Sequence, residues 1–195
     1  MIQRVGGAAA GAAVATCAGL VYYGRGVRRS RGGADAGTLL RAHAEAEGIP
    51  HHDTVSILVP GRVGVKDLAE AFFNSPAFAL ERAVLPHSTS DEQAHAFAAG
   101  SLQPFALWKN EDRNESEILT TWSAGATRGA TWFRVVPEED DRTRLELGSS
   151  MGFTGGSSGW LNTLLLPLVV PAHIAYSKVL LQSAAARLNP RHHDV

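Results

Sequence analysis

Three β-strand candidates lie close together in residues 117–151, which read EILTTWSAGATRGATWFRVVPEEDDRTRLELGSSM. Short runs rich in β-branched and aromatic residues are typical of strands, and we expect strands at residues 117–122, 130–136 and 144–151. The segments between them contain Gly125 or the four acidic residues 138–141, as hairpin turns do. A fourth candidate at 105–110 ends before the polar segment 112–114. This spacing predicts an antiparallel meander.

One strand and several helices are predicted before the meander. The expected elements are a short helix at 39–47, a strand at 52–59, a helix at 65–73 and another helix from Pro76 onward. Within 52–59, Val55 and Ile57 fall on one face of an alternating pattern. Within 65–73, Leu68 and Phe72 are separated by one helical turn.

A long helix is predicted after the meander, at about residues 171–188. Pro171 suits the first turn of a helix, and Asn189-Pro190 suits its end. A second transmembrane span over 160–181 is the alternative. It is disfavoured because that stretch contains prolines, a histidine and a lysine. We therefore expect a core helix that lies across the sheet.

Composition excludes several classes of protein. The chain has 195 residues, 45% of them hydrophobic and 19% charged, which is enough apolar material for a core. Cys17 is the single cysteine, so neither an intramolecular disulfide nor a cysteine-based zinc site is expected. A net charge of −1 gives no electrostatic case for nucleic acid. We expect no metal and no cofactor.

The first residues differ from the rest of the chain. Residues 1–34 carry five arginines and no acid, and residues 5–23 carry no charge. That uncharged run is close to the roughly 20 residues that cross a bilayer as a helix, so we expect a membrane anchor. Gly7 and Gly11 have the spacing that allows close packing against a partner helix.

Two alternatives for this leader are an organelle presequence, mitochondrial targeting included, and a cleaved secretory signal. The whole chain then divides into an anchor or targeting segment, a basic linker with a short helix, a main domain and a tail, at residues 1–24, 25–50, 51–189 and 190–195.

The order of these elements resembles the START-like, or Bet v 1-like (SRPBCC), helix-grip superfamily. Residues 71–76 (AFFNSP) are similar to an A-F-F-x-S-P segment of an uncharacterised bacterial family in it, and residues 102–105 and 171–173 also match. The resemblance covers about residues 52–188 and implies an α+β fold in which a curved antiparallel sheet grips the long C-terminal helix. Residues 154–159 (TGGSSG) depart from it, because they interrupt the passage from the last strand to that helix.

The resemblance also implies an apolar cavity between sheet and helix. Six residues are candidates for lining it, namely Trp108, Trp122, Trp132, Phe133, His173 and Glu81. The aromatic residues suit a core equally well. His173 suits a helix terminus, and Glu81 suits a surface pair with Arg82.

Three functions follow from these observations. The favoured one is a membrane-tethered START-like domain that binds a hydrophobic small molecule or lipid without catalysis. The first alternative is a non-catalytic accessory subunit of a membrane complex, with Gly7 and Gly11 facing a partner helix. The second is a cavity enzyme of the cyclase or hydrolase type, in which His173 acts as a base.

Overall fold

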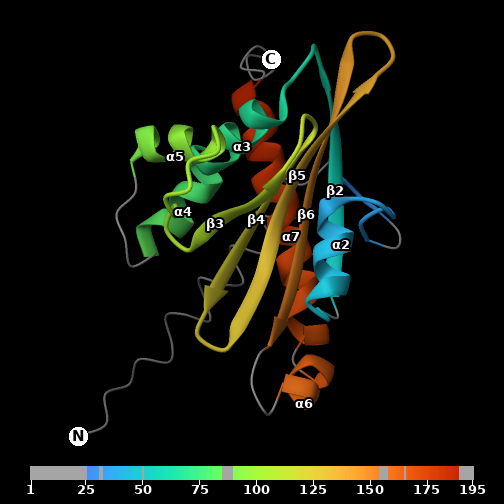
Figure 1. Ribbon diagram of the computed structural model, residues 1–195. Helices are drawn as coiled ribbons and strands as arrows, with labels where there is room; N and C mark the ends of the chain where they lie inside the picture. Colours follow the sequence, from blue (N-terminus) through green and yellow to red (C-terminus); the bar gives the residue numbers. More distant parts are fainter. Residues whose placement is uncertain are drawn as a thin grey trace, which may run out of the picture.

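The computed structural model describes residues 26–30, 33–49, 51–84, 90–153, 158–164 and 166–188 (Figure 1). Its elements are β1 (Arg28–Arg29), α2 (Leu39–Ala46), β2 (His51–Pro60), α3 (Val65–Phe73), α4 (Pro76–Val84), α5 (Asp91–Ala98), β3 (Trp108–Arg113), β4 (Glu117–Ala124), β5 (Thr127–Glu138), β6 (Arg142–Phe153), α6 (Ser158–Leu164) and α7 (Leu166–Leu188). The expected anchor at 1–24, with Gly7 and Gly11, and the tail at 190–195 lie outside the described residues.

The six strands form one antiparallel sheet in the order β1-β2-β6-β5-β4-β3. The β5–β6 hairpin is the longest pairing and runs from Thr127 opposite Phe153 to Glu138 opposite Arg142. β2 comes first among the long strands, yet it pairs with the last strand, β6. The predicted meander and the α+β fold class are confirmed.

The curved sheet carries helices on both faces (Figure 1). α7 packs against β2 and β6 on one face, which we call the inner face, and α3 joins it there. α2 crosses β2, β4, β5 and β6 on the opposite, outer face. Because successive strand residues point to opposite faces, each strand divides its side chains between these two environments.

α7 begins at Leu166, five residues before the expected start at Pro171. Pro167 occupies the first turn, where a proline costs no helical hydrogen bond, and Pro171 lies inside the helix. The buried positions Ile174, Ser177 and Leu181 recur at helical spacing and face the core. No helix in the described part of the chain has the length and hydropathy that a membrane crossing needs.

β3 begins at Trp108, whereas the sequence predicted a strand from residue 105. Phe105 and Trp108 exchange backbone hydrogen bonds of 2.9 Å across a tight turn. Ala106 inside that turn has a φ of 53°, a left-handed conformation that no strand contains. The turn therefore delays the strand by three residues.

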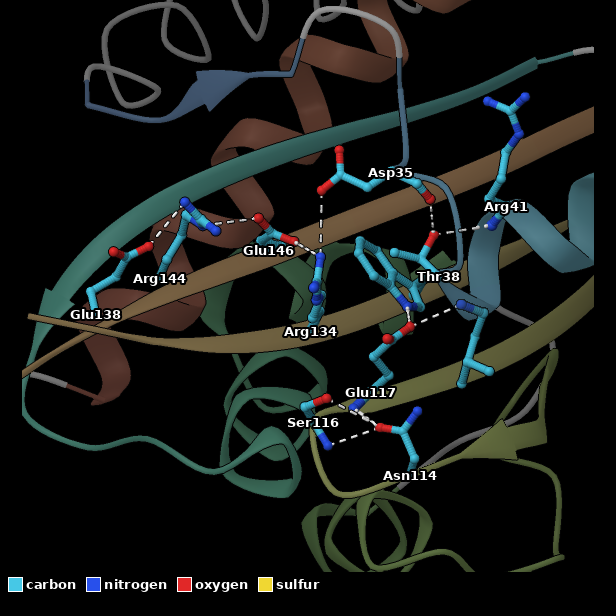
Figure 2. Close-up of polar contacts among 12 residues, drawn as sticks. Asp35, Thr38, Arg41, Asn114, Ser116, Glu117, Arg134, Glu138, Arg144 and Glu146 are labelled. Atoms are coloured by element: carbon cyan, nitrogen blue, oxygen red, sulfur yellow. Dashed lines mark hydrogen bonds and ion pairs between the residues drawn. The ribbon is translucent and has the colours of Figure 1, made fainter.

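Within the segment 25–50, expected to be a basic linker with a short helix, the structure has an edge strand, β1, as well as the expected helix, α2. Arg28 and Arg29 pair with β2 as an edge strand. α2 docks on the outer face through Glu117, whose Oε2 accepts hydrogen bonds from the Leu39 backbone N–H at 2.9 Å and from Trp132 Nε1–H at 2.7 Å (Figure 2). This buried carboxylate ties helix, β4 and β5 together.

Aromatic rings fill the core between the inner face and the helices α3, α4 and α5. Phe73 is fully buried, and its ring centroid lies 5.1–6.0 Å from those of Phe72, Phe78, Phe97, Phe105, Phe133 and Trp108. Ser75 and Pro76 begin α4 as predicted, with the Phe78 N–H donating to Ser75 Oγ at 3.2 Å. This cluster packs α3, α4 and α5 against the inner face.

Candidate functional site

A cavity of about 340 Å³ lies between the inner face of the sheet and α7. Its lining is mainly aromatic and aliphatic, and it consists of Phe72, Glu81, Leu107, Trp108, Trp122, Ala124, Thr131, Leu147, Gly148, Ser149, Met151, His173, Ser177 and Leu180. None of these lining residues is lysine or arginine. A mostly apolar wall with a few polar groups is typical of sites for small molecules.

The aromatic wall depends on a cross-strand pair and on one glycine. Trp108 of β3 stands opposite Trp122 of β4, and Trp108 Nε1–H donates to Thr131 Oγ1 at 3.1 Å. Gly129 lies beside Trp122 in the sheet, and a Cβ placed there would meet the Trp122 ring at 2.7 Å. The absence of a side chain at Gly129 therefore lets the Trp122 indole lie against the sheet.

Polar side chains gather at one part of the cavity wall, from β2, β6 and α7. Asp53 is only 2% exposed, and its carboxylate contacts His51 Nε2 at 3.0 Å and Ser149 Oγ at 3.4 Å. Ser149 Oγ in turn lies 2.5 Å from His173 Nε2, which is 3.9 Å from the Asp53 carboxylate. We call these four residues, His51, Asp53, Ser149 and His173, the inner polar cluster.

Burial sets the charge state of His173. Removal from water lowers the pKa of His173 below its ordinary value near 6.5, and the Asp53 carboxylate only partly opposes this effect. The His173 ring is therefore neutral at pH 7. A neutral ring has one donor nitrogen and one acceptor nitrogen, so it can bond Ser149 in either direction.

Glu81 of α4 is the second titratable group that lines the cavity. Burial raises the pKa of the Glu81 carboxyl, while a hydrogen bond with Tyr176 of α7 partly offsets the shift. The pKa of the Tyr176 hydroxyl is raised as well, by its own burial and by Glu81. The pair joins α4 to α7 at the cavity wall.

The inner polar cluster does not have the geometry of a serine hydrolase triad. In such a triad the acid holds Nδ1 of the histidine while Nε2 faces the serine. Here both Ser149 Oγ and the Asp53 carboxylate approach the same His173 nitrogen, Nε2. This arrangement suits hydrogen bonding of a polar group better than activation of the serine. In the described part of the chain, no group of three or more His, Cys, Asp or Glu residues is placed to hold a metal ion.

Four of the six residues predicted to line a cavity do line this one, namely Trp108, Trp122, His173 and Glu81. Phe133 is on the inner face but is fully buried, with its ring centroid 5.0 Å from that of Phe72. Trp132 is on the outer face, where it bonds Glu117 beneath α2. Trp132 and Phe133 are neighbours in one strand, so they cannot face the same side.

Sequence reasoning missed Asp53 and Ser149, which the fold brings together across β2 and β6. A signal for both was present. Asp53 shares the alternating face of Val55, and Ser149 is two residues from Leu147 on the same face. Following each apolar face for two more residues along its strand reaches Asp53 in β2 and Ser149 in β6, so both polar residues face the core.

A second, larger hollow of about 540 Å³ lies beside α2 and the ends of β3, β4 and β5. Its lining includes the charged residues Glu47, Lys109, Glu111 and Arg128. Arg128 is already paired with Glu47 at 2.8 Å. A charged surface groove of this kind is less suited to an apolar molecule than the inner cavity is.

Comparison with protein-family models gives no match, and comparison with curated proteins gives none. One similar solved structure is a conserved protein from Geobacillus kaustophilus, with 14% identity over 70% of this chain and 96% of that chain and a TM-score of 0.39. The Zhui aromatase/cyclase from Streptomyces sp. R1128 has 10% identity over 71% of this chain and 97% of that chain, with a TM-score of 0.31. The lipid transfer and protein localization domain of human StarD13 has 11% identity over 72% of this chain and 79% of that chain, with a TM-score of 0.25.

At these identities and TM-scores the likenesses carry no functional argument. The fold assignment rests on this chain's own topology. An antiparallel sheet in the order β1-β2-β6-β5-β4-β3 curves around a 23-residue helix, α7. Within the described residues, the three helices α3, α4 and α5 lie between β2 and β3 in the chain. By that arrangement the chain has the α+β helix-grip fold.

Proposed function

We propose that this protein is a membrane-tethered helix-grip domain that holds a hydrophobic small molecule or lipid between its sheet and α7. The observation that carries the proposal is the inner cavity. Its volume of about 340 Å³ lies within the range of about 300–1,000 Å³ that small-molecule sites occupy. Trp108, Trp122 and Leu180 supply apolar surface, and the inner polar cluster supplies a few hydrogen-bonding groups.

The experiment is native mass spectrometry of the purified full chain, followed by organic extraction and identification of what is released. We expect a co-purifying hydrophobic molecule. Leu180→Trp places a larger side chain in the cavity wall and should abolish that adduct. Leu102→Trp is the matched control, because Leu102 is 90% exposed and outside the cavity. A wild-type chain without any adduct and without uptake of added lipid would contradict the proposal.

Membrane attachment is the second part of the proposal. It is supported by the uncharged run at residues 5–23 and by apolar exposure near the start of α7. Leu164, Leu168 and Val169 are 60%, 74% and 45% exposed, and no Lys, Arg, Asp or Glu occurs between residues 147 and 177. Hydrophobic side chains at one end of the molecule suit contact with lipid. An organelle location after targeting by the leader is the alternative.

Flotation with liposomes tests this attachment. The full chain should float with the vesicles, and Leu168→Lys should weaken flotation if α7 also contacts lipid. Deletion of residues 1–24 should reduce flotation most. If the full chain stays in the soluble fraction at low and high salt alike, the tether is wrong.

An accessory role in a membrane complex is the alternative function, with Gly7 and Gly11 facing a partner helix. Gly7→Ile together with Gly11→Ile should then release the protein from its complex in a mild-detergent pull-down. Unchanged recovery of the same partners would argue for a lone anchored domain.

A further inference from the structure

The inner polar cluster has an unusual composition for a hydrophobic core. Asp53 is a buried carboxylate, and a charge removed from water is costly unless it is paired. Its contacts within the described residues are with His51, Ser149 and His173, with no arginine or lysine among them. The cluster is thus a set of hydrogen-bonding groups in which no lysine or arginine balances the charge of the Asp53 carboxylate.

Two members of this cluster reach the cavity. Ser149 and His173 line it, whereas Asp53 and His51 stand behind them and do not. The short Ser149 Oγ–His173 Nε2 contact of 2.5 Å still leaves a lone pair on Oγ and the second ring nitrogen of His173. A ligand group at this part of the wall therefore meets both an acceptor and a group whose donor and acceptor roles can exchange.

The charged groups around the cavity further restrict which ligands can bind there. The carboxylate of Asp53 lies directly behind Ser149, and Glu81 is in the cavity wall. No lysine or arginine is among the lining residues, and burial keeps His173 neutral at pH 7 through its lowered pKa. An anionic head group would enter a site with acidic neighbours and no cation to balance it.

We propose that the inner cavity selects neutral hydrophobic molecules that carry a hydroxyl group, an alcohol or a phenol, bound at Ser149 and His173, and discriminates against carboxylates such as fatty acid anions. A hydroxyl both donates and accepts one hydrogen bond, so it matches either proton arrangement of the pair. This inference rests on the proposed ligand-binding function and names the class of ligand.

The test uses three naphthalenes of nearly equal size as probes of the full chain: 2-naphthol, 2-methylnaphthalene and 2-naphthoate. One added hydrogen bond should make 2-naphthol bind about 2- to 12-fold more tightly than 2-methylnaphthalene. The anion 2-naphthoate should bind about tenfold or more weakly than 2-naphthol. Dissociation constants are measured by competition against a fluorescent apolar dye at pH 7.

Single-residue variants show which side chains cause the preference for 2-naphthol over 2-methylnaphthalene. Ser149→Ala should bind 2-naphthol and 2-methylnaphthalene equally, while Ser149→Thr, which keeps a hydroxyl, should retain the preference. Ser116→Ala removes a hydroxyl in the β3–β4 turn, outside the cavity, and is the matched control. Thermal unfolding by circular dichroism checks that each variant is folded. His173→Gln is the second variant if Ser149→Ala unfolds, and it should weaken the preference in the same direction.

The outcomes separate this inference from the proposed function. If no probe binds the wild-type chain, the cavity function itself is wrong. Equal binding of 2-naphthol and 2-methylnaphthalene, or tighter binding of 2-naphthoate, overturns the hydroxyl site while the apolar cavity stands. Loss of the preference in Glu81→Gln but not in Ser149→Ala would place the hydroxyl at the Glu81–Tyr176 pair and also overturn it.

Discussion

Acidification should destabilise this protein through His173, and His173→Gln should remove part of that loss. Burial lowers the pKa of His173 below its ordinary value near 6.5, so the unfolded chain takes up this proton at a higher pH than the folded chain does. Between those two pKa values the unfolded state binds more protons. The free energy of unfolding therefore falls as the pH decreases through that window, and the contribution is fully present above pH 6.5.

The size of the effect follows from one proton. A full difference of one bound proton changes the free energy of unfolding by about 1.4 kcal/mol per pH unit. At pH 6.5 about half of the unfolded chains carry this proton while the folded chain does not, so we expect a slope of about half that size there, or ~0.7 kcal/mol per pH unit. His52 has a pKa lowered by burial too, so it adds a slope of the same sign.

The assay is urea unfolding of the full chain at pH 7.5, 6.5 and 5.5, followed by circular dichroism. Between pH 7.5 and 5.5, the free energy of unfolding of His173→Gln should fall less steeply than that of the wild type. His52→Gln still has His173, so it should keep the part of the fall that His173 causes. The comparison uses the difference between the two proteins, because burial raises the pKa of Glu81 and of Glu146 and so favours the folded chain in acid. Equal slopes for the wild type and His173→Gln would mean that folding leaves the pKa of His173 unchanged and would contradict this prediction. A shallower decline in the wild type than in His173→Gln would mean that the folded chain binds this proton more tightly than the unfolded chain does.

Two further predictions concern the two faces of the sheet. Glu117→Ala should lower the free energy of unfolding by about 2–4 kcal/mol, because the Leu39 N–H and Trp132 Nε1–H lose their buried acceptor. Glu117→Gln keeps an acceptor oxygen, so it should lower the free energy of unfolding clearly less. Equal losses for the two variants in urea unfolding would contradict this prediction. Gly129→Ala should cost about 1–3 kcal/mol and weaken probe binding, since its Cβ would meet a carbonyl oxygen of β6 at 2.1 Å and the Trp122 ring at 2.7 Å. Wild-type stability and affinity in that variant would show that Trp122 does not depend on this glycine.

Much of the fold is predictable because its signals are local. Alternation at 52–59 and helical period at 65–73 appear in the structure within one residue as β2 and α3. The errors at β3 and α7 also have local causes. Ala106 adopts a left-handed turn that its residue type does not announce, and Pro167 takes the first-turn position that the sequence assigned to Pro171.

The candidate site is less predictable because it depends on pairing between distant strands. His173 and Glu81 were identifiable as polar residues in apolar surroundings, and both line the cavity. Asp53 and Ser149 become partners only because β2 pairs with β6 in a register that sets them opposite each other. That register is fixed by burial of the whole sheet, which no short stretch of sequence encodes.

The packing of β1 and α2 on the sheet is a second long-range effect. Arg28 and Arg29 read as part of a basic linker, but their backbone completes the edge of the sheet beside β2. The Glu117 carboxylate then holds the first turn of α2 from a position 78 residues away in the chain (Figure 2). Charge composition alone gives no indication of either contact.

Intermolecular nuclear Overhauser effects between bound 2-methylnaphthalene and the side chains of the full chain would show whether an apolar molecule binds between the sheet and α7. We expect contacts with Met151, Leu180 and Trp108, which line the inner cavity and not the groove beside α2. Contacts confined to Ile49 and Pro104 of that groove, or no contacts at saturating probe, would contradict it.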